Sequence, residues 1–261
     1  MPNTSHGLPA TLWLWAGQAI YRGPSLRLDA HSTAVDCLAV GIDAPFTLAA
    51  DGRVRTARSA LVPPRRVHRV VTEGDHMMFC YLDPGSPAAR ACRARMTQWD
   101  NDFGLHHVSE NALATAAGSA RPEPGSLAGL AGAAPVAPLD ERIVEALADL
   151  HAHPAAAFTA ARFAAAAHLS ESRFLHLFAA QAGTSFRRYR LWVRMLAVGR
   201  AIAGGANLTM ASTDAGFASP SHFSDTFRTL FGLSASDLLA TGVQVVVLDL
   251  AEGIESRQGT C

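Results

Sequence analysis

Two short runs of the sequence place polar side chains at helical spacing, where they could hydrogen-bond to the edges of nucleic-acid bases. In the first run Phe174 and Phe178 lie one helical turn apart, which is typical of a helix face that packs into a core. The same geometry turns Ser172, Leu175 and His176 outward. An apolar Leu175 on a polar face is unusual for a solvated helix, but it suits contact with thymine methyl groups.

The second run has the same design. Phe223 and Phe227 form its core face, again one turn apart. The residues that this spacing turns outward are Pro220, Ser221, Ser224 and Asp225. The Asp225 carboxylate can accept a hydrogen bond from cytosine N4, and it can equally cap a helix or repel the wrong sequence.

The elements that must position these residues are two helix-turn-helix units, each with a small-residue helix, a tight turn and a second helix. They cover Phe163–Phe178 and Thr209–Phe227. A helix of about 18 residues, Phe186–Ala203, joins them and spans nearly 30 Å at about 1.5 Å per residue. That length approaches one turn of B-DNA, about 34 Å, so the two second helices could enter successive major grooves on one face of a duplex.

Basic side chains gather at the start of the joining helix. Arg187 and Arg188 are expected to bind DNA phosphates, because guanidinium groups suit bidentate phosphate contacts. The alternative is an ordinary solvated helix face. All 22 basic residues of the chain are arginine, and the acidic residues balance them to a formal net charge of zero. The non-specific electrostatic contribution to DNA binding should therefore be modest.

The N-terminal part of the chain has a different pattern. Short apolar runs separated by turn signals occupy roughly residues 12–83, which favours a β-sandwich or small barrel. A helix is expected from Ser86 to Trp99. Residues from roughly Asn111 to Pro138 are rich in Ala, Gly, Pro and Ser, which is typical of a linker, and Glu110–Ala117 could form a short helix within it. An amphipathic helix should open at Leu139, and Val243–Leu248 looks like a strand that has no evident partner.

Several classes of protein are disfavoured. The four cysteines, Cys37, Cys80, Cys92 and Cys261, form no CxxC pair, so a structural zinc site is not expected. No signal peptide or membrane-length apolar stretch is evident, which indicates a cytoplasmic protein with buried, reduced cysteines. No cofactor and no catalytic residue are predicted.

The region from Phe158 to Leu239 resembles the DNA-binding domain of AraC/XylS-type transcriptional regulators. The residues that carry the resemblance include Leu169-Ser170, Arg173-Phe174, Gly183–Phe186, Asp214–Phe217, Phe223, Phe227 and Gly232. The resemblance implies that Ser172, Leu175 and His176, with their counterparts in the second unit, read bases. The chain departs from the family pattern at Met210, at Ala235 and at Asp225, where a basic residue is common.

The N-terminal region resembles the cupin-type sensor domain of many such regulators, through Leu61–His68 and Tyr81–Pro84. His31 stands where a His-x-His metal cluster often begins, but Thr33 occupies the partner position. Hydrogen-bonded histidines are therefore favoured over a metal site. The effector is expected in a barrel cavity with His31 and His68 at its polar edge and an apolar lining that includes Leu38, Val40, Phe46, Leu48 and Phe79.

The combined prediction is an α+β chain with a cupin-like barrel (residues 1–100), a linker (101–138), an all-α double helix-turn-helix domain (139–240) and a tail (241–261). The predicted function is transcription regulation, as an activator or a repressor, under control of a small-molecule effector. The expected partners are double-stranded DNA, RNA polymerase and a second copy of the chain, with no membrane. The alternative is a metal-dependent cupin enzyme, or a metal or redox sensor, fused to a DNA-binding domain.

Overall fold

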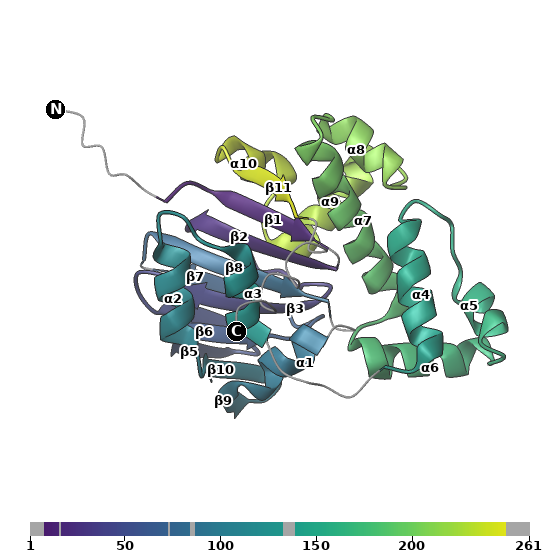
Figure 1. Cartoon of the computed structure of the whole chain (residues 1–261), viewed down its shortest axis with the longest axis horizontal. Coiled ribbons are helices and arrows are strands. Elements are labelled where there is room, and N and C mark those ends of the chain that lie inside the picture. The colour runs from purple at the N-terminus through teal and green to yellow at the C-terminus, as the bar shows by residue number, and fades with distance from the viewer. Residues whose placement is uncertain (1–7, 16, 73, 84–86, 133–138, 249–261) are drawn as a thin grey trace, which may run out of the picture.

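A computed structural model describes residues 8–15, 17–72, 74–83, 87–132 and 139–248 of the chain. An N-terminal sheet domain packs directly against a C-terminal helical domain (Figure 1). Cys261 and the rest of the predicted tail beyond residue 248 lie outside the described residues. The two-domain α+β architecture agrees with the prediction.

The larger sheet has eight strands in the order β11-β1-β2-β8-β3-β6-β10-β9. Its strands are β1 (Thr11–Trp15), β2 (Gln18–Pro24), β3 (Asp36–Gly41), β6 (Ser59–Val62), β8 (His76–Leu82), β9 (Met96–Asp100), β10 (Phe103–His107) and β11 (Gln244–Val247). All neighbours pair antiparallel except β11, which runs parallel to β1 in the register Thr11 to Gln244 through Leu14 to Val247. The C-terminal strand without an evident partner thus completes the edge of the N-terminal sheet.

The smaller sheet has the order β5-β4-β7, with β4 (Phe46–Ala50), β5 (Arg53–Ala57) and β7 (Arg69–Thr72). The strand β5 was not anticipated; it pairs with β4 across a turn in which Asp51 and Gly52 both have positive φ. One of the short apolar runs in the predicted β-rich region, Ser25–Leu28, does not form a strand. The prediction of a closed barrel is wrong. The three-stranded sheet is too narrow to cover one whole face of the eight-stranded sheet, and the two sheets do not join into a barrel. The C-terminal helices cover the rest of that face instead.

Helices cover the other face of the eight-stranded sheet. They are α1 (Pro87–Ala94), α2 (Glu110–Gly118) and α3 (Pro124–Gly132). Leu113, Leu127 and Ala131 are fully buried against the sheet. The buried Arg22 of β2 donates hydrogen bonds to the carbonyl oxygens of Ala117 (2.8 Å) and Ser119 (2.6 Å), which fastens the end of α2 to the sheet.

Two expectations about this part of the chain differ from the structure. The helix expected from Ser86 to Trp99 ends at Ala94, and Met96–Asp100 forms β9. Residues 103–132, placed in the predicted linker, form β10, α2 and α3, of which only α2 matches the short helix expected at Glu110–Ala117. Small residues suit such close packing as well as they suit a linker: a Cβ atom on Gly132 would lie 2.3 Å from the carbonyl oxygen of Ala88.

The helical domain consists of α4 (Glu141–Ala152), α5 (Ala160–Ala166), α6 (Glu171–Ala182), α7 (Phe186–Ala203), α8 (Leu208–Asp214), α9 (Pro220–Phe231) and α10 (Ala235–Ala240). The helices α4, α5, α6 and the start of α7 enclose their own core. The helices α8, α9 and α10 and the rest of α7 share one core with the sheet domain. The second half of the helical domain therefore packs into the core of the sheet domain, whereas the first half has a core of its own.

Candidate nucleic-acid interface and interdomain pocket

The first helix-turn-helix unit is α5 followed by α6. The Ser170 hydroxyl caps α6 by accepting a hydrogen bond from the backbone N–H of Arg173. Phe174 and Phe178 are fully buried, as their spacing predicted. The structure brings Ser172, Leu175 and His176 together on the exposed side of α6, with 38% of Leu175 exposed. Base contacts by these three residues stay a prediction.

The second unit is α8 followed by α9, with Ser219 as the cap of α9. Phe223 is buried and Phe227 is half-buried, so the core face was predicted correctly. The outward residues Pro220, Ser221, Ser224 and Asp225 are all exposed. Both recognition helices, α6 and α9, end at a glycine in the left-handed conformation, Gly183 and Gly232 respectively.

The two arginines predicted to bind phosphate lie in different surroundings. Arg187 is exposed. Arg188 points into the sheet domain, where its guanidinium donates hydrogen bonds to the carbonyl oxygens of Ser32 (3.1 Å) and Thr33 (2.9 Å) and to the Ser32 hydroxyl (3.0 Å). Phosphate binding by Arg188 stays a prediction, and in this arrangement of the domains the side chain is already engaged.

Other arginines of α7 also bind backbone carbonyl oxygens. Arg190 donates to Ala156, Arg194 donates to Pro154, and Arg200 donates to Trp15 at the end of β1. Burial lowers the pKa of each of these guanidinium groups. These three arginines of α7 therefore make structural contacts within the protein.

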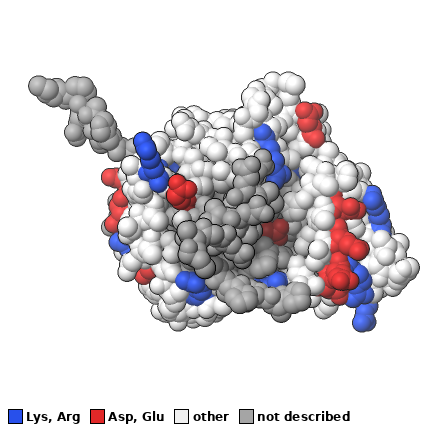
Figure 2. Space-filling view, viewed as in Figure 1, with Lys and Arg blue, Asp and Glu red and all other residues white. Residues whose placement is uncertain are grey.

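Charge is sparse and mixed on the face that Figure 2 shows, and acidic side chains gather there over α4. The acidic residues of that helix are Glu141, Glu145 and Asp149. Carboxylates repel DNA phosphates, so we expect the duplex to approach a different side of the helical domain.

A loop of the sheet domain holds the end of the second recognition helix. The backbone N–H of Asp29 donates to the carbonyl oxygen of Gly232 (2.8 Å), and that of Ser32 donates to Thr229 (3.1 Å). A Cβ atom on Gly232 would lie 2.6 Å from both the Asp29 carbonyl oxygen and His31 Nδ1. Glycine is required here both for its left-handed backbone, with φ +76°, and for this close approach.

A second polar contact joins the sheet domain to the first helix-turn-helix unit. The hydroxyl of Tyr189 on α7 donates a short hydrogen bond to the Asp83 carboxylate at the end of β8. His151 Nε2, on α4, lies 2.8 Å from the Tyr189 hydroxyl and 3.3 Å from Asp83 Oδ2. Burial raises the pKa of the Tyr189 hydroxyl, so the group remains a hydrogen-bond donor.

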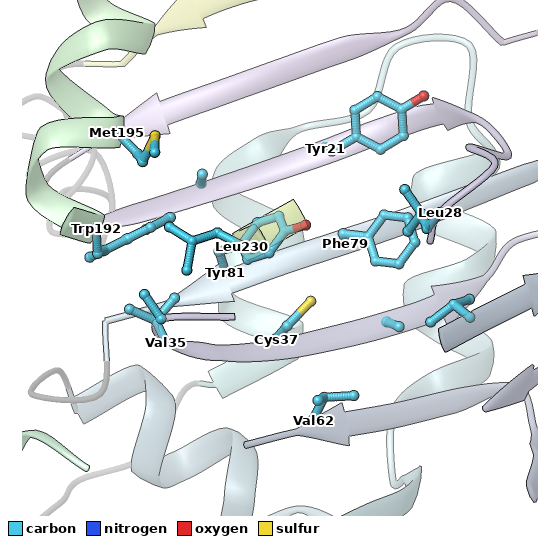
Figure 3. Packing of buried hydrophobic residues seen from close by; sticks show 14 of the residues in the cluster. Tyr21, Leu28, Val35, Cys37, Val62, Phe79, Tyr81, Trp192, Met195 and Leu230 are labelled. Atoms are coloured by element: carbon cyan, nitrogen blue, oxygen red, sulfur yellow. The ribbon is translucent and has the colours of Figure 1, made fainter. Parts of the chain in front are cut away.

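Between the two domains lies an apolar pocket of about 100 Å³. Figure 3 shows part of the surrounding core, with Trp192 of α7 close to Tyr81 on the sheet. The walls from the sheet domain include Leu12, Leu14, Ala19, Tyr21, Leu26, Leu28, Phe79, Tyr81 and Val245. Those from the helices include Trp192, Met195, Leu196, Ile202, Phe223, Phe227, Phe231 and Leu238. Helix α9 therefore contributes side chains to the pocket on one side and the predicted base-reading residues on the other.

The residues predicted to line one effector cavity are divided by the structure. Phe79 lines the interdomain pocket. Phe46 belongs to the same core but lies under the smaller sheet. Leu38 and Val40 project from the opposite face of the larger sheet and pack with the α1–α3 layer. Because Phe79 lies on one face of the larger sheet and Leu38 and Val40 lie on the other, these side chains do not line a single cavity.

His31 and His68 do meet, but away from the pocket lining. Their backbones form an antiparallel bridge and their ring centroids are 4.3 Å apart. Each Nδ1 lies about 3 Å from a backbone carbonyl oxygen, that of Asp29 (2.9 Å) or Arg66 (3.0 Å). Burial lowers the pKa of both imidazoles, that of His68 to about 4 with a further effect of the neighbouring His31.

The alternative functions need a set of metal ligands or a reactive thiol. In the described part of the chain, no group of three or more His, Cys, Asp or Glu side chains is placed to hold a metal ion. Cys37, Cys80 and Cys92 are buried, and burial raises the pKa of each thiol. Raised pKa values and burial both disfavour the reactive thiolate that a redox sensor uses.

The pocket residues of α7 were missed in the sequence, although a signal for them exists. Phe186, Tyr189 and Val193 face the core of the first unit, whereas Trp192, Met195 and Leu196 face the sheet. A helix with apolar residues around most of its circumference is buried on more than one side. That pattern indicates a second packing partner for Phe186–Ala203.

Comparisons with known proteins agree with this architecture. Residues 163–241 match a family described as a helix-turn-helix domain. No curated protein shows detectable sequence similarity to the chain. No helix of the described ranges has the length and apolar character needed to cross a membrane.

Solved structures of ToxT from Vibrio cholerae share the fold of almost the whole chain. A structure of an apo ToxT variant is 12% identical, with a TM-score of 0.58 over 86% of this chain and 97% of that one. A 1.65 Å structure of ToxT is also 12% identical, with a TM-score of 0.54 over the same shares. ToxT bound to an unsaturated fatty acid is 10% identical, with a TM-score of 0.52 over 92% and 98%.

The family match at residues 163–241 includes both helix-turn-helix units, with α6 and α9 as their second helices. The sheet domain and the helical domain together share the overall fold of the ToxT structures. The chain carries an AraC-type helix-turn-helix domain at residues 163–241, joined to an N-terminal sheet domain in a ToxT-like two-domain fold.

Proposed function

We propose that this chain is a transcription regulator that binds duplex DNA through α6 and α9 and is controlled by a small apolar molecule in the interdomain pocket. The observation that carries the proposal is the double role of α9. Its exposed side presents Ser221, Ser224 and Asp225, and its buried side contributes Phe223 and Phe227 to the pocket. A ligand that changes the packing of the buried side acts directly on the orientation of the exposed side.

Control follows from linkage. A ligand shifts an equilibrium between domain arrangements only when it binds one arrangement more tightly than another. The pocket has walls from β1, β2 and β8 on one side and from α7, α9 and α10 on the other. Separation of the domains removes one wall of the pocket, so the ligand favours the arrangement in which the two domains are packed together. By reciprocity, DNA that favours another arrangement weakens ligand binding.

The fatty-acid-bound structure of ToxT supports a small-molecule effector on this fold. The proposal includes action in the cytoplasm, contact with RNA polymerase and assembly as a homodimer. The base-reading residues are those predicted from the sequence, and Arg187 is the phosphate contact that the docked arrangement leaves accessible.

The test starts with the full chain and a pool of random duplexes, from which bound sequences are selected and then footprinted. We expect protection of two major-groove segments about 34 Å apart on one face of the duplex. Adding a ligand of the pocket should change the affinity for the selected site. Absence of any sequence enrichment at low salt would overturn the proposal, as would a footprint of a single groove that persists after α9 is altered at Ser221 and Ser224.

A further inference from the structure

The interdomain pocket is lined almost entirely by apolar side chains. Every lining residue is uncharged, and almost all of the surface that these residues expose to the pocket is apolar. The chain contains no lysine, and among the described residues no arginine or histidine lines the pocket. A ligand in this pocket therefore meets no group that could neutralise a carboxylate or a phosphate.

The few polar atoms of the walls already have partners within the protein. The Tyr21 hydroxyl donates to the carbonyl oxygen of Pro24 at 2.7 Å, and Trp192 Nε1 donates to that of Gly17 at 3.2 Å. The Tyr81 hydroxyl interacts with the Cys37 thiol. Burial raises the pKa of both tyrosines, so these hydroxyls stay neutral.

From this geometry we infer that the pocket binds an uncharged, apolar molecule about the size of a single ring. An ionised group buried without a partner is strongly disfavoured, which excludes an acid inserted with its head group in the pocket. The volume of about 100 Å³ is smaller than the apolar cavity of about 150 Å³ that accommodates benzene, so a single ring is the largest ligand that the pocket can hold. Phe79, Phe223 and Phe227 supply aromatic faces on which a ring can pack.

This inference rests on the proposed function for the role of the pocket, but it makes a separate claim about ligand chemistry. It also separates this chain from ToxT, one structure of which holds an unsaturated fatty acid. A long-chain acid exceeds the volume of this pocket and finds no cation in its walls.

The experiment compares ligands that share a ring and differ in charge, with a fatty acid beside them. Toluene, benzoate and decanoate are titrated separately into the full chain at pH 7 by isothermal titration calorimetry. We expect toluene to bind with one site per chain, and benzoate to bind at least about 100-fold more weakly. Benzoate or decanoate binding as tightly as toluene would overturn the inference, and so would the absence of toluene binding.

Two neighbouring positions on β11 provide a matched pair of variants. Val245 is half-buried and lines the pocket, whereas Val246 is 37% exposed and does not line it. Val245→Phe should fill the pocket and abolish toluene binding, and Val246→Phe should leave it unchanged. Leu239→Trp, on α10, fills the pocket from another wall and serves if Val245→Phe fails to fold. Toluene binding that survives in both folded filling variants would place the ligand elsewhere and overturn the inference.

The affinity for the selected DNA, measured in the same samples, separates the two claims. If toluene binds and Val245→Phe abolishes that binding, but DNA affinity does not respond, the ligand chemistry holds and control through the pocket fails. If an acid binds in the pocket and changes DNA affinity, the proposed control holds and the inference about an uncharged ligand is wrong.

Discussion

The guanidinium of Arg188 on α7 donates a 2.9 Å hydrogen bond to the carbonyl oxygen of Thr33 in the sheet domain. The same side chain binds Ser32, whose backbone N–H donates to Thr229 near the end of α9. An arginine beside the first recognition helix and the end of the second are thereby held by one loop. The predicted phosphate contact of Arg188 would compete with these hydrogen bonds and would couple domain docking to DNA binding at this residue.

Neighbouring arginines should separate the two roles. Arg188→Gln should lower the thermal midpoint, because the hydrogen bonds to Ser32 and Thr33 are lost, at a cost of about 1–3 kcal/mol. Arg187→Gln should leave the midpoint unchanged, since Arg187 is exposed, and should reduce the salt dependence of DNA binding by about one phosphate contact. Thermal denaturation and salt titrations check both; equal midpoints for the two variants would contradict the assignment.

Base specificity tests the residues that are predicted to contact bases. His176→Ala and Ser221→Ala should each relax base preference in a different half of the site, by about 1–3 kcal/mol if the contact is direct. Binding to a panel of single-base variants of the selected site measures this. Ser236→Ala, exposed on α10, is the control and should leave the preference unchanged. A loss of base preference spread evenly over both halves of the DNA site would contradict the prediction that α6 and α9 each contact a different half.

The histidine pair predicts a dependence of stability on pH. The pKa of His68 is lowered to about 4, so below the ordinary value of about 6.5 the unfolded chain takes up a proton that the folded chain does not. Stability should fall as pH decreases from about 6.5 to about 4, by at most about 3 kcal/mol from this residue. The buried Asp36, whose pKa is raised to about 6, acts in the opposite direction between about pH 4 and 6.

Comparison of variants isolates the effect of His68. His68→Gln should flatten the loss of stability between pH 6.5 and 4, measured by urea denaturation at each pH. His153→Gln, at an exposed position of the helical domain, should keep the pH profile of the original chain. An unchanged profile in a folded His68→Gln protein would show that this imidazole does not cause the acid sensitivity.

Two tyrosines allow a comparison of a charged and a neutral acceptor. Tyr189→Phe removes the donor to the buried Asp83 carboxylate and should cost about 1.5–3 kcal/mol. Tyr21→Phe removes a donor to the neutral carbonyl of Pro24 and should cost about 0.5–1.5 kcal/mol. Urea denaturation measures both. A larger loss for Tyr21→Phe would mean that the contact between Asp83 and Tyr189 does not stabilise the domain junction.

The local features of the helical domain were predictable from the sequence because they depend on residues close together in the chain. The spacing of Phe174 and Phe178 determines which side of α6 is buried, and therefore which side carries His176. Ser170 and Gly183 mark the ends of the same helix through capping and a left-handed residue. The second unit follows the same rules with Ser219 and Gly232.

The composition of a segment left more than one structure open. The Ala- and Gly-rich stretch that begins near residue 111 suits a linker, yet most of it forms α2 and α3, because small side chains also allow close packing on a sheet. The strand β11 was visible as an apolar run, but its pairing with β1 joins residues more than 200 positions apart. Local pattern has no information about such a partner.

Only the tertiary structure decided where the pocket lies. Strand register pairs Ala39 with Phe79 and Leu38 with Cys80, which places Phe79 on one face of the sheet and Leu38 on the other. Since side chains alternate along a strand, the sequence alone determined that two sets of apolar residues exist on opposite faces. Which set meets α7 and α9 depends on long-range packing, and that packing placed the pocket between the domains, where α9 contributes to both the pocket and the predicted DNA-reading surface.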